Sequence, residues 1–217
     1  KLQIQYDFLK HNPEYSFCCY RYHIYEQNKN RYLKEYAFNY YKEGEDLEIS
    51  EDLMLKIWVT QTMSTMIPEK LWKSVIIKKK PYVYSRDVHT YYFLLKEGKG
   101  VSLNRNMGVY RWHDSGVAIG QTFDSKYKIG YELYRELYLS NIDDTLLIRK
   151  IFFFCYYYIL CGKWSMYLLQ VFKYLWRIEK SRRKRLYLLL ACIIPSALAK
   201  KIICKRRNNR NEHRLIS

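Results

Sequence analysis

Residues 86–113, RDVHTYYFLLKEGKGVSLNRNMGVYRWH, decide the fold class of this chain, because a helical pattern turns directly into a strand pattern within them. Gly98 divides the two halves, and glycine commonly ends a helix. Residues 100–112 after it are strand-like. The half before it predicts a helix, whose apolar face consists of Val88, Tyr91, Tyr92 and Leu95.

The same alternation of helix and strand patterns is found at the N-terminal end. Residues 2–11 have helical spacing, and Asn12-Pro13 ends this predicted helix. Its expected apolar face consists of Leu2, Tyr6 and Leu9. Residues 16–25, SFCCYRYHIY, alternate and predict a strand. One side of that strand is expected to consist of Cys18, Tyr20, Tyr22 and Ile24.

Further elements are predicted between and beyond these segments. A short helix fits residues 46–58, with Ser50 as a possible N-cap. Residues 59–67, VTQTMSTMI, alternate like a strand, and Pro68 then opens a helix. Another helix is expected around residues 126–139. Short strands that alternate with helices predict an α/β layered domain, although no Gly-rich phosphate-binding turn accompanies them.

Charge divides the chain into two parts with a boundary near Asp144. The formal net charge is +17. Residues 1–144 contain 21 Lys and Arg against 19 Asp and Glu, whereas residues 145–217 contain 17 against 2. We therefore predict a nearly neutral folded region at 1–144 and a basic helical tail at 145–217.

The cysteines and the acidic residues do not form a recognisable metal pattern. Six cysteines are present without a CxxC pair, so reduced, buried thiols are the favoured interpretation, and packing is favoured for Cys18-Cys19. An acidic stretch at residues 43–52 lacks the pattern of a Ca²⁺-binding loop and is interpreted as a solvated connector.

Three stretches, taken in order, resemble the family 2 glycosyltransferases of bacterial surface-polysaccharide synthesis. The opening KLQIQYDFL with the following NPEY resembles the segment after the family's metal-binding acidic motif. TMSTM at 62–66 resembles the strand before the acceptor pocket. The Arg86-Asp87 pair, KEGK at 96–99 and YRWH at 110–113 resemble the acceptor-side helix and the closing Tyr-Arg-x-His turn.

This resemblance implies the C-terminal portion of a Rossmann-like, type A nucleotide-sugar domain. It implies an inverting sugar transfer from a nucleotide-diphospho-sugar donor to a lipid-linked or saccharide acceptor, with a divalent metal, Mn²⁺ or Mg²⁺. In the family the nucleotide-binding half and the metal-binding aspartates precede the KLQ segment. We therefore expect most of the metal ligands upstream of Lys1, and the donor half to be missing from this chain.

Asp87 matches the position at which the family keeps its acidic catalytic base. Inverting transfer needs a carboxylate to accept the proton of the acceptor hydroxyl. An aspartate at a helix start is also a common cap, whose charge the helix dipole stabilises. Both interpretations of Asp87 stay open from the sequence.

Four further residues are candidates for the same site. His113 matches a histidine that contacts the metal or the donor diphosphate, and neutral imidazole suits such ions. Arg111 could neutralise a diphosphate leaving group through its planar fork, or form a surface ion pair. Arg86 and His89 flank Asp87 and are candidates for contacting the acceptor.

The tail combines two short apolar runs with basic flanks. The runs at 151–162 and 186–199 are shorter than the roughly 20 residues of a spanning helix, and Pro195 interrupts the second. Arg182-Arg183-Lys184-Arg185 and Lys200-Lys201 flank that run, and aromatic residues such as Trp164 suit a headgroup region. We expect peripheral or monotopic attachment to an anionic membrane, at the cytoplasmic face. A helical hairpin packed on the catalytic region is the alternative.

Two other classes of function compete with the transferase. A nucleic-acid-binding protein would use exposed basic residues along a phosphate backbone, but here the basic clusters flank apolar runs, so we expect no nucleic-acid partner. A non-catalytic membrane-bound partner that keeps only the acceptor and anchoring parts is also compatible with the sequence.

Overall fold

The computed structural model describes residues 1–84, 86–113, 123–140, 145–161, 166–178 and 180–193, together with residues 198, 201 and 205. The chain forms two compact units, the first within Lys1–Gly116 and the second within Val117–His213. Their division lies between Gly116 and Val117, whereas the change in composition lies near Asp144. Trp164, Pro195 and Lys200 lie outside the described residues.

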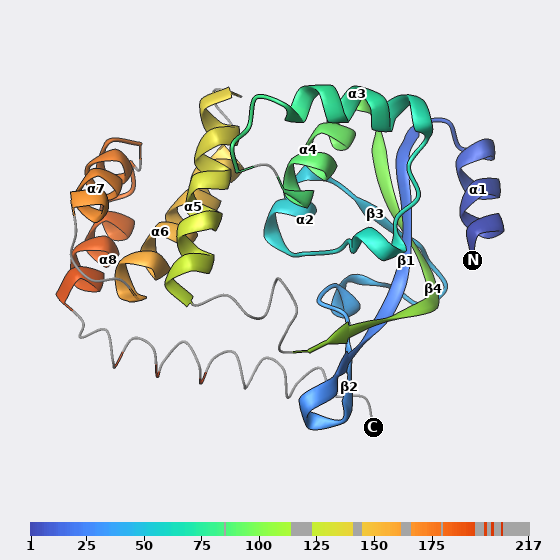
Figure 1. The fold of residues 1–217 in the computed structure, drawn as a ribbon, viewed down its shortest axis with the longest axis horizontal. Helices are drawn as coiled ribbons and strands as arrows, with labels where there is room; N and C mark the ends of the chain where they lie inside the picture. Colours follow the sequence, from blue (N-terminus) through green and yellow to red (C-terminus); the bar gives the residue numbers. More distant parts are fainter. Residues whose placement is uncertain are drawn as a thin grey trace. The chain divides into compact units, whose positions relative to one another are not determined.

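The first unit is a mixed sheet with helices on both faces (Figure 1). Its strands within the described residues have the order β2-β1-β4-β3, in which β1 and β4 are parallel and the outer pairs are antiparallel. This arrangement confirms the predicted α/β class. The elements are α1 (Leu2–His11), β1 (Tyr15–Glu26), η1 (Gln27–Lys29), β2 (Arg31–Lys34), η2 (Phe38–Tyr40), β3 (Leu47–Ile49), α2 (Glu51–Lys56), η3 (Thr62–Ser64), α3 (Glu69–Lys79), α4 (Asp87–Glu97) and β4 (Lys99–Trp112).

The first half of β1 is buried on both faces, as expected for a strand in the middle of a covered sheet. On one face Cys18 packs with Val101 and with Phe8 of α1. On the other face the ring of Phe17 lies 5.2 Å from that of Tyr91 in α4. The predicted strand at 16–25 is thus confirmed, but burial alternates only in its second half.

The helix at 2–11 is confirmed, but of its expected apolar face only Leu9 packs against the core. Leu2 and Tyr6 are exposed, and the buried residue is Gln5. The amide of Gln5 donates to the carbonyls of Cys18 and Ser64, both at 2.9 Å, and so joins α1 to β1 and η3. A buried amide with both donors satisfied stabilises this junction, because each unsatisfied carbonyl would be costly.

The helix and strand predicted within 86–113 are confirmed as α4 and β4. Gly98 lies between them with extended backbone, and its role is close approach rather than a left-handed turn. A Cβ on Gly98 would lie 2.6 Å from the backbone oxygen of Glu14. Leu94 is fully buried, whereas the predicted Leu95 is half-buried.

The predicted strand at residues 59–67 is wrong. This segment forms η3 and makes one isolated antiparallel bridge, between Cys18 and Met66. The alternation in the sequence does not report a ladder here, because hydrogen bonds of Gln61 close the turn locally. The short helix predicted at 46–58 is confirmed only at Glu51–Lys56, because Leu47–Ile49 form β3 instead. Its N-cap is Ser50, as predicted, since the Ser50 hydroxyl accepts from the Leu53 amide at 3.2 Å.

The second unit is helical, and the predicted helix around residues 126–139 is confirmed as part of it. Gly130 allows close packing of the first two helices, since a Cβ there would lie 2.1 Å from the ring of Phe154. The core includes Tyr131, Leu137 and Ile151. Its helices are α5 (Phe123–Ser140), α6 (Thr145–Cys161), α7 (Met166–Ile178) and α8 (Arg182–Ile193).

Candidate functional site

The candidate site is centred on Asp87, which begins α4 and is exposed. The hydroxyl of Thr62 in η3 donates to its Oδ2 at 3.0 Å. A carboxylate at a helix start is stabilised by the free amides and by the helix dipole. The rest of the helix up to Leu94 is buried, so Asp87 is an accessible group on a fixed support.

Lys79, the last residue of α3, lies close to the start of α4. Its ammonium group donates to the Thr90 hydroxyl at 2.7 Å. Burial lowers the pKa of Lys79, and the charge of Asp87 opposes that effect. A cation is thus held within electrostatic range of the candidate base.

His89, two residues after Asp87, is fully buried. Its Nδ1 accepts from the backbone amide of Arg86 at 3.2 Å, and its ring lies 4.7 Å from that of Tyr82. Burial, and then the charges of Lys79 and Arg86, lower the pKa of His89 to about 4. The imidazole therefore faces the interior in this structure, whereas the sequence suggested contact with the acceptor.

The next turn of α4 is joined to the segment after η3. The hydroxyl of Thr65 donates to the carbonyl of Gln61 at 3.0 Å, so the Tyr91 hydroxyl donates to Thr65 at 2.8 Å. Burial raises the pKa of Tyr91 well above its usual range, so this phenol stays protonated. Together with the Thr62 contact, this bond fixes η3 against α4.

Arg111 and His113 are not brought to Asp87. Arg111 pairs with Tyr25 near the far end of the β1–β4 ladder, and His113 follows β4. Asp87 is bound to η3, which contacts the ladder at Tyr20 through a 2.9 Å bond to the Met63 carbonyl. Tyr20 and Tyr25 are separated by five residues, about 16 Å of extended strand. The structure therefore gathers Arg86, Asp87 and His89 at the start of α4 but places Arg111 near the far end of β4 and His113 just after it.

The described residues do not supply a complete metal site. No group of three or more His, Cys, Asp and Glu side chains in this part of the chain is placed to hold an ion. The adjacent thiols Cys18 and Cys19 are free and buried, and burial raises the pKa of each to about 12. Neither is a thiolate at neutral pH, which confirms the packing interpretation.

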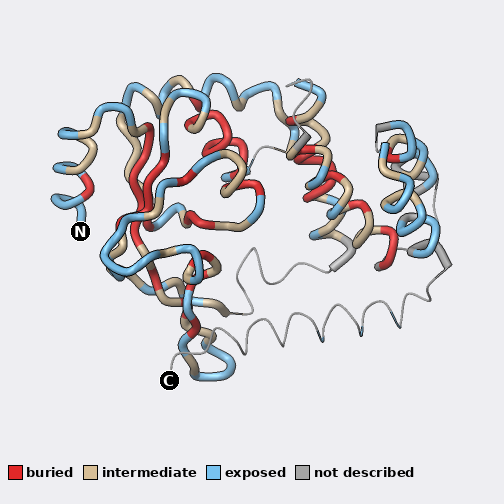
Figure 2. Tube along the Cα trace, turned by 180° about the vertical axis from the view of Figure 1, so that it is seen from behind, coloured by how far each residue is buried: buried red, intermediate tan, exposed pale blue. Residues whose placement is uncertain are grey.

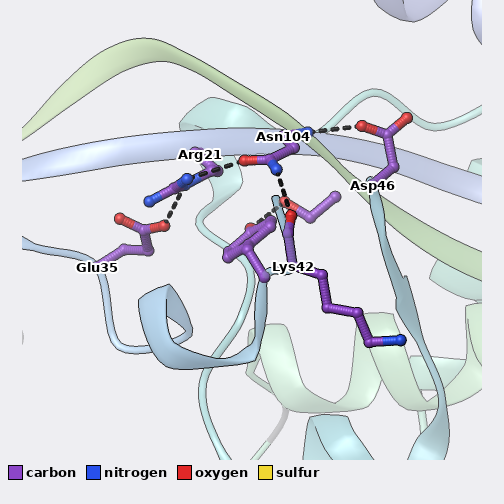
Figure 3. A network of polar contacts seen from close by, with 7 residues as sticks. Arg21, Glu35, Lys42, Asp46 and Asn104 are labelled. Atoms are coloured by element: carbon purple, nitrogen blue, oxygen red, sulfur yellow. Dashed lines mark hydrogen bonds and ion pairs between the residues drawn. The ribbon is translucent and has the colours of Figure 1, made fainter. Parts of the chain in front are cut away.

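A second polar cluster joins β1, β4 and the segment before β3 (Figure 3). Arg21 donates to the buried carboxylate of Glu35 and to the Asn104 side chain, both at 2.8 Å. Asn104 also binds the Lys42 carbonyl and the Asp46 carboxylate. An open pocket of about 580 Å³ lies beside this cluster, between α1 and β4. Because the Asn104 side chain is already bonded on both sides, we interpret the cluster as structural.

Sequence reasoning missed Thr62 and Lys79 as neighbours of Asp87, and Tyr82 as a neighbour of His89. Lys79 belongs to the run Lys78-Lys79-Lys80, which is typical of a solvated loop. Nothing in such a run distinguishes the lysine that turns inward. The alternating pattern places Thr62 in a predicted strand. It gives no sign of the η3 turn that brings Thr62 to α4.

Comparison of the chain with protein-family models and with curated proteins finds no match to either.

Proposed function

We propose that the first unit is the acceptor side of an inverting glycosyltransferase similar to family 2, and that Asp87 is its general base. The observation that carries this proposal is the geometry at α4. An exposed carboxylate begins a helix whose next seven residues are buried, and a hydroxyl from another segment fixes its orientation. Asp87 is the first residue of α4 rather than its N-cap, which is Arg86, so its carboxylate is not at the position from which a capping side chain usually accepts the free amides.

The proposed chemistry moves one proton and exchanges one bond. The acceptor hydroxyl oxygen attacks the anomeric carbon of the donor sugar, and the carbon–oxygen bond to the diphosphate breaks. The hydroxyl proton passes to Asp87, whose negative charge and accessibility suit that transfer. Thr62 orients the carboxylate through Oδ2, which leaves Oδ1 for the acceptor.

A divalent metal would neutralise the developing diphosphate charge when bound. His113 is the candidate ligand among the described residues, but the set around it is incomplete, so no step is assigned to the ion. Arg111 is exposed and could neutralise phosphate charge, yet it is not close to Asp87 along the sheet. The proposal assigns donor binding to residues outside the described site.

The second unit supports attachment to an anionic membrane surface as part of the same proposal. Among the described residues, no helix has both the length and the apolar character needed to cross a bilayer. Arg182 and Arg183 begin α8 and are exposed. One to two turns later, Leu186, Leu189 and Leu190 are each exposed by about half. They share a helical face with Arg182, so cations lead into an apolar surface suited to headgroups and acyl chains.

Sugar transfer by the protein expressed from its complete reading frame tests the proposal. Asp87→Asn keeps the shape and the Thr62 contact but removes the base, so turnover should fall by about 10²–10⁴-fold. Asp52→Asn is the control, because Asp52 is also a carboxylate in the first turn of a helix, where it is partly exposed and ion-paired with Lys56. Near-parent transfer by Asp87→Asn would show that Asp87 is only a helix residue, and would leave a non-catalytic membrane-bound partner as the alternative.

A further inference from the structure

The first turn of α4 is closed by an unusual group. A helix start leaves backbone amides without partners, which Ser, Thr, Asp or Asn at the N-cap, or Glu or Gln three residues later, usually satisfy. Here the N-cap is Arg86, which makes no such bond. Instead the imidazole of His89 reaches back from the third helical position and accepts from the Arg86 amide.

The contacts of His89 determine which ring nitrogen carries the hydrogen. Nδ1 accepts a hydrogen bond, so it lacks a proton, and the neutral ring carries its hydrogen on Nε2. Nε2 is buried without a hydrogen-bond partner among the described residues. The ring is held by Tyr82, whose own ring also contacts Phe93. The imidazole is therefore fixed in one orientation and one tautomer.

Charging this ring would open the turn. A protonated Nδ1 would point its hydrogen at the Arg86 amide, so a donor would face a donor. The groups around it oppose the charge as well. Burial is the main effect, and Lys79 from α3 and Arg86 add positive charge, while the ring of Tyr82 packs against the imidazole. Asp87, on the same turn, is the carboxylate within two residues.

A neutral acceptor is the suitable choice beside Asp87. A glutamate at the same helical position would close the turn equally well but would place a second carboxylate two residues from Asp87. Like charges at that separation compete for the same proton and for the same cation, here Lys79. An imidazole supplies the acceptor without a charge.

We propose that His89 is a positioning residue, whose imidazole closes the first turn of α4 and thereby fixes the Asp87 carboxylate beside Thr62 and within range of Lys79. The effect of this positioning on catalysis depends on the proposed function, whereas the positioning of Asp87 by His89 does not. His89 touches neither the acceptor nor the donor in this account. It acts through Asp87.

The first test needs no substitution. NMR of the ¹⁵N-histidine-labelled full chain should show His89 with hydrogen on Nε2 only. The ring should stay uncharged while the pH falls from 7 to 5. A hydrogen on Nδ1, or a ring that titrates near the ordinary pKa of about 6.5, would overturn the proposal, whatever the variants below show.

The second test uses the pKa of Lys79 to report the position of Asp87, because the charge of Asp87 affects that pKa. In the parent chain, Asp87→Asn should lower the Lys79 pKa, because it removes a nearby negative charge. The same drop is expected in a His89→Gln background, since the Gln carbonyl can accept from Arg86 without charge. In a His89→Leu background the drop should be reduced or lost. An equal drop in all three backgrounds, with folding checked by circular dichroism, would overturn the proposal.

The His89→Gln variant keeps the test decisive if His89→Leu does not fold. A folded His89→Gln chain in which Asp87→Asn no longer affects Lys79 contradicts the rescue and hence the proposal. Neither NMR experiment includes a sugar donor. The role of His89 and the proposed transferase function can therefore be refuted separately. If Asp87→Asn changes the Lys79 pKa in the three backgrounds as expected but leaves sugar transfer unchanged, only the proposed function is refuted. If Asp87→Asn no longer changes the Lys79 pKa in the folded His89→Gln chain but still strongly reduces sugar transfer, only the role of His89 is refuted.

Discussion

Helices α4 and α8 have nearly the same length, 11 and 12 residues, but they differ in what surrounds them. Seven consecutive residues of α4 are buried, so its exposed start is a rigid support for Asp87 (Figure 2). In α8 the basic start is followed by exposed leucines. A buried helix can position one reacting group, whereas a helix with an exposed apolar face needs another surface to cover it. These surroundings fit the two tasks that we propose, sugar transfer at α4 and membrane attachment at α8.

The largest effect that tests this comparison of α4 and α8 is a loss of membrane binding when the basic residues at the start of α8 are replaced. Changing Arg182, Arg183, Lys184 and Arg185 to glutamine should weaken binding to vesicles with anionic lipid by about 10²–10³-fold, at about 1 kcal/mol per basic residue. Vesicle sedimentation measures this. Binding of the parent should also weaken with salt. Equal binding of parent and variant, or binding to neutral vesicles of the same strength, would contradict the proposed attachment.

Acid should affect the first unit in a way that reports on α4. The His89 pKa is about 4 in the folded chain and should be near 6.5 when unfolded, so the unfolded state binds more protons between these values. Stability from this group is complete above about pH 6.5 and is lost as the pH falls toward 4. The loss should amount to a few kcal/mol. Urea unfolding followed through first-unit signals measures it, and the slope over this window should flatten in His89→Gln.

Gly98→Ala tests the packing that supports Asp87. The added Cβ would meet the backbone oxygen of Glu14, which cannot move as a side-chain tip could. We expect the free energy of unfolding of the first unit to fall by about 1–3 kcal/mol. Denaturant unfolding measures the change, and vesicle binding by the same variant should stay at the parent level. Unchanged stability would mean that the α4–β4 turn is looser than described.

The smallest effect is expected from the leucines of α8. Leu186→Ser with Leu190→Ser should reduce vesicle binding by about 10-fold, because each side chain is already half-covered and only the remaining apolar area is gained on insertion. The remaining binding should become more sensitive to salt. Leu2→Ser is the control, since Leu2 is an exposed leucine on α1 of the first unit. A similar loss of vesicle binding in the α8 variant and in Leu2→Ser would contradict a specific role of the α8 leucines.

The elements that could be predicted from sequence are those whose pattern is local. The helix before Gly98 and the strand after it, the Ser50 cap and the helix at 2–11 depend on spacing and on single cap or breaker residues. The burial of Gln5 could not be predicted, because its two carbonyl partners lie 13 and 59 residues away. The short strands β2 and β3 depend on partners in β1 and β4 rather than on their own residues.

In the candidate site, too, local patterns predict some features and contacts between distant segments determine the others. Asp87 was found through its place at a helix start and through the resemblance. Its neighbours cannot be predicted from the sequence, because Thr62 contacts the carboxylate from the η3 turn and Lys79 interacts with it electrostatically from the end of α3. His89 was named for contact with the acceptor, but the sequence does not show which side of the helix faces inward at its first turn.

Chemical rescue at Asp87 tests the central claim most directly. Single-turnover transfer by the protein from its complete reading frame, carrying Asp87→Ala, should be about 10²–10⁴-fold slower than the parent. Added formate, a small carboxylate that can occupy the vacated space, should raise that rate with concentration, and it should not affect the Asp52→Ala control. A rate for Asp87→Ala close to that of the parent, without formate, would contradict the assignment of Asp87 as the base.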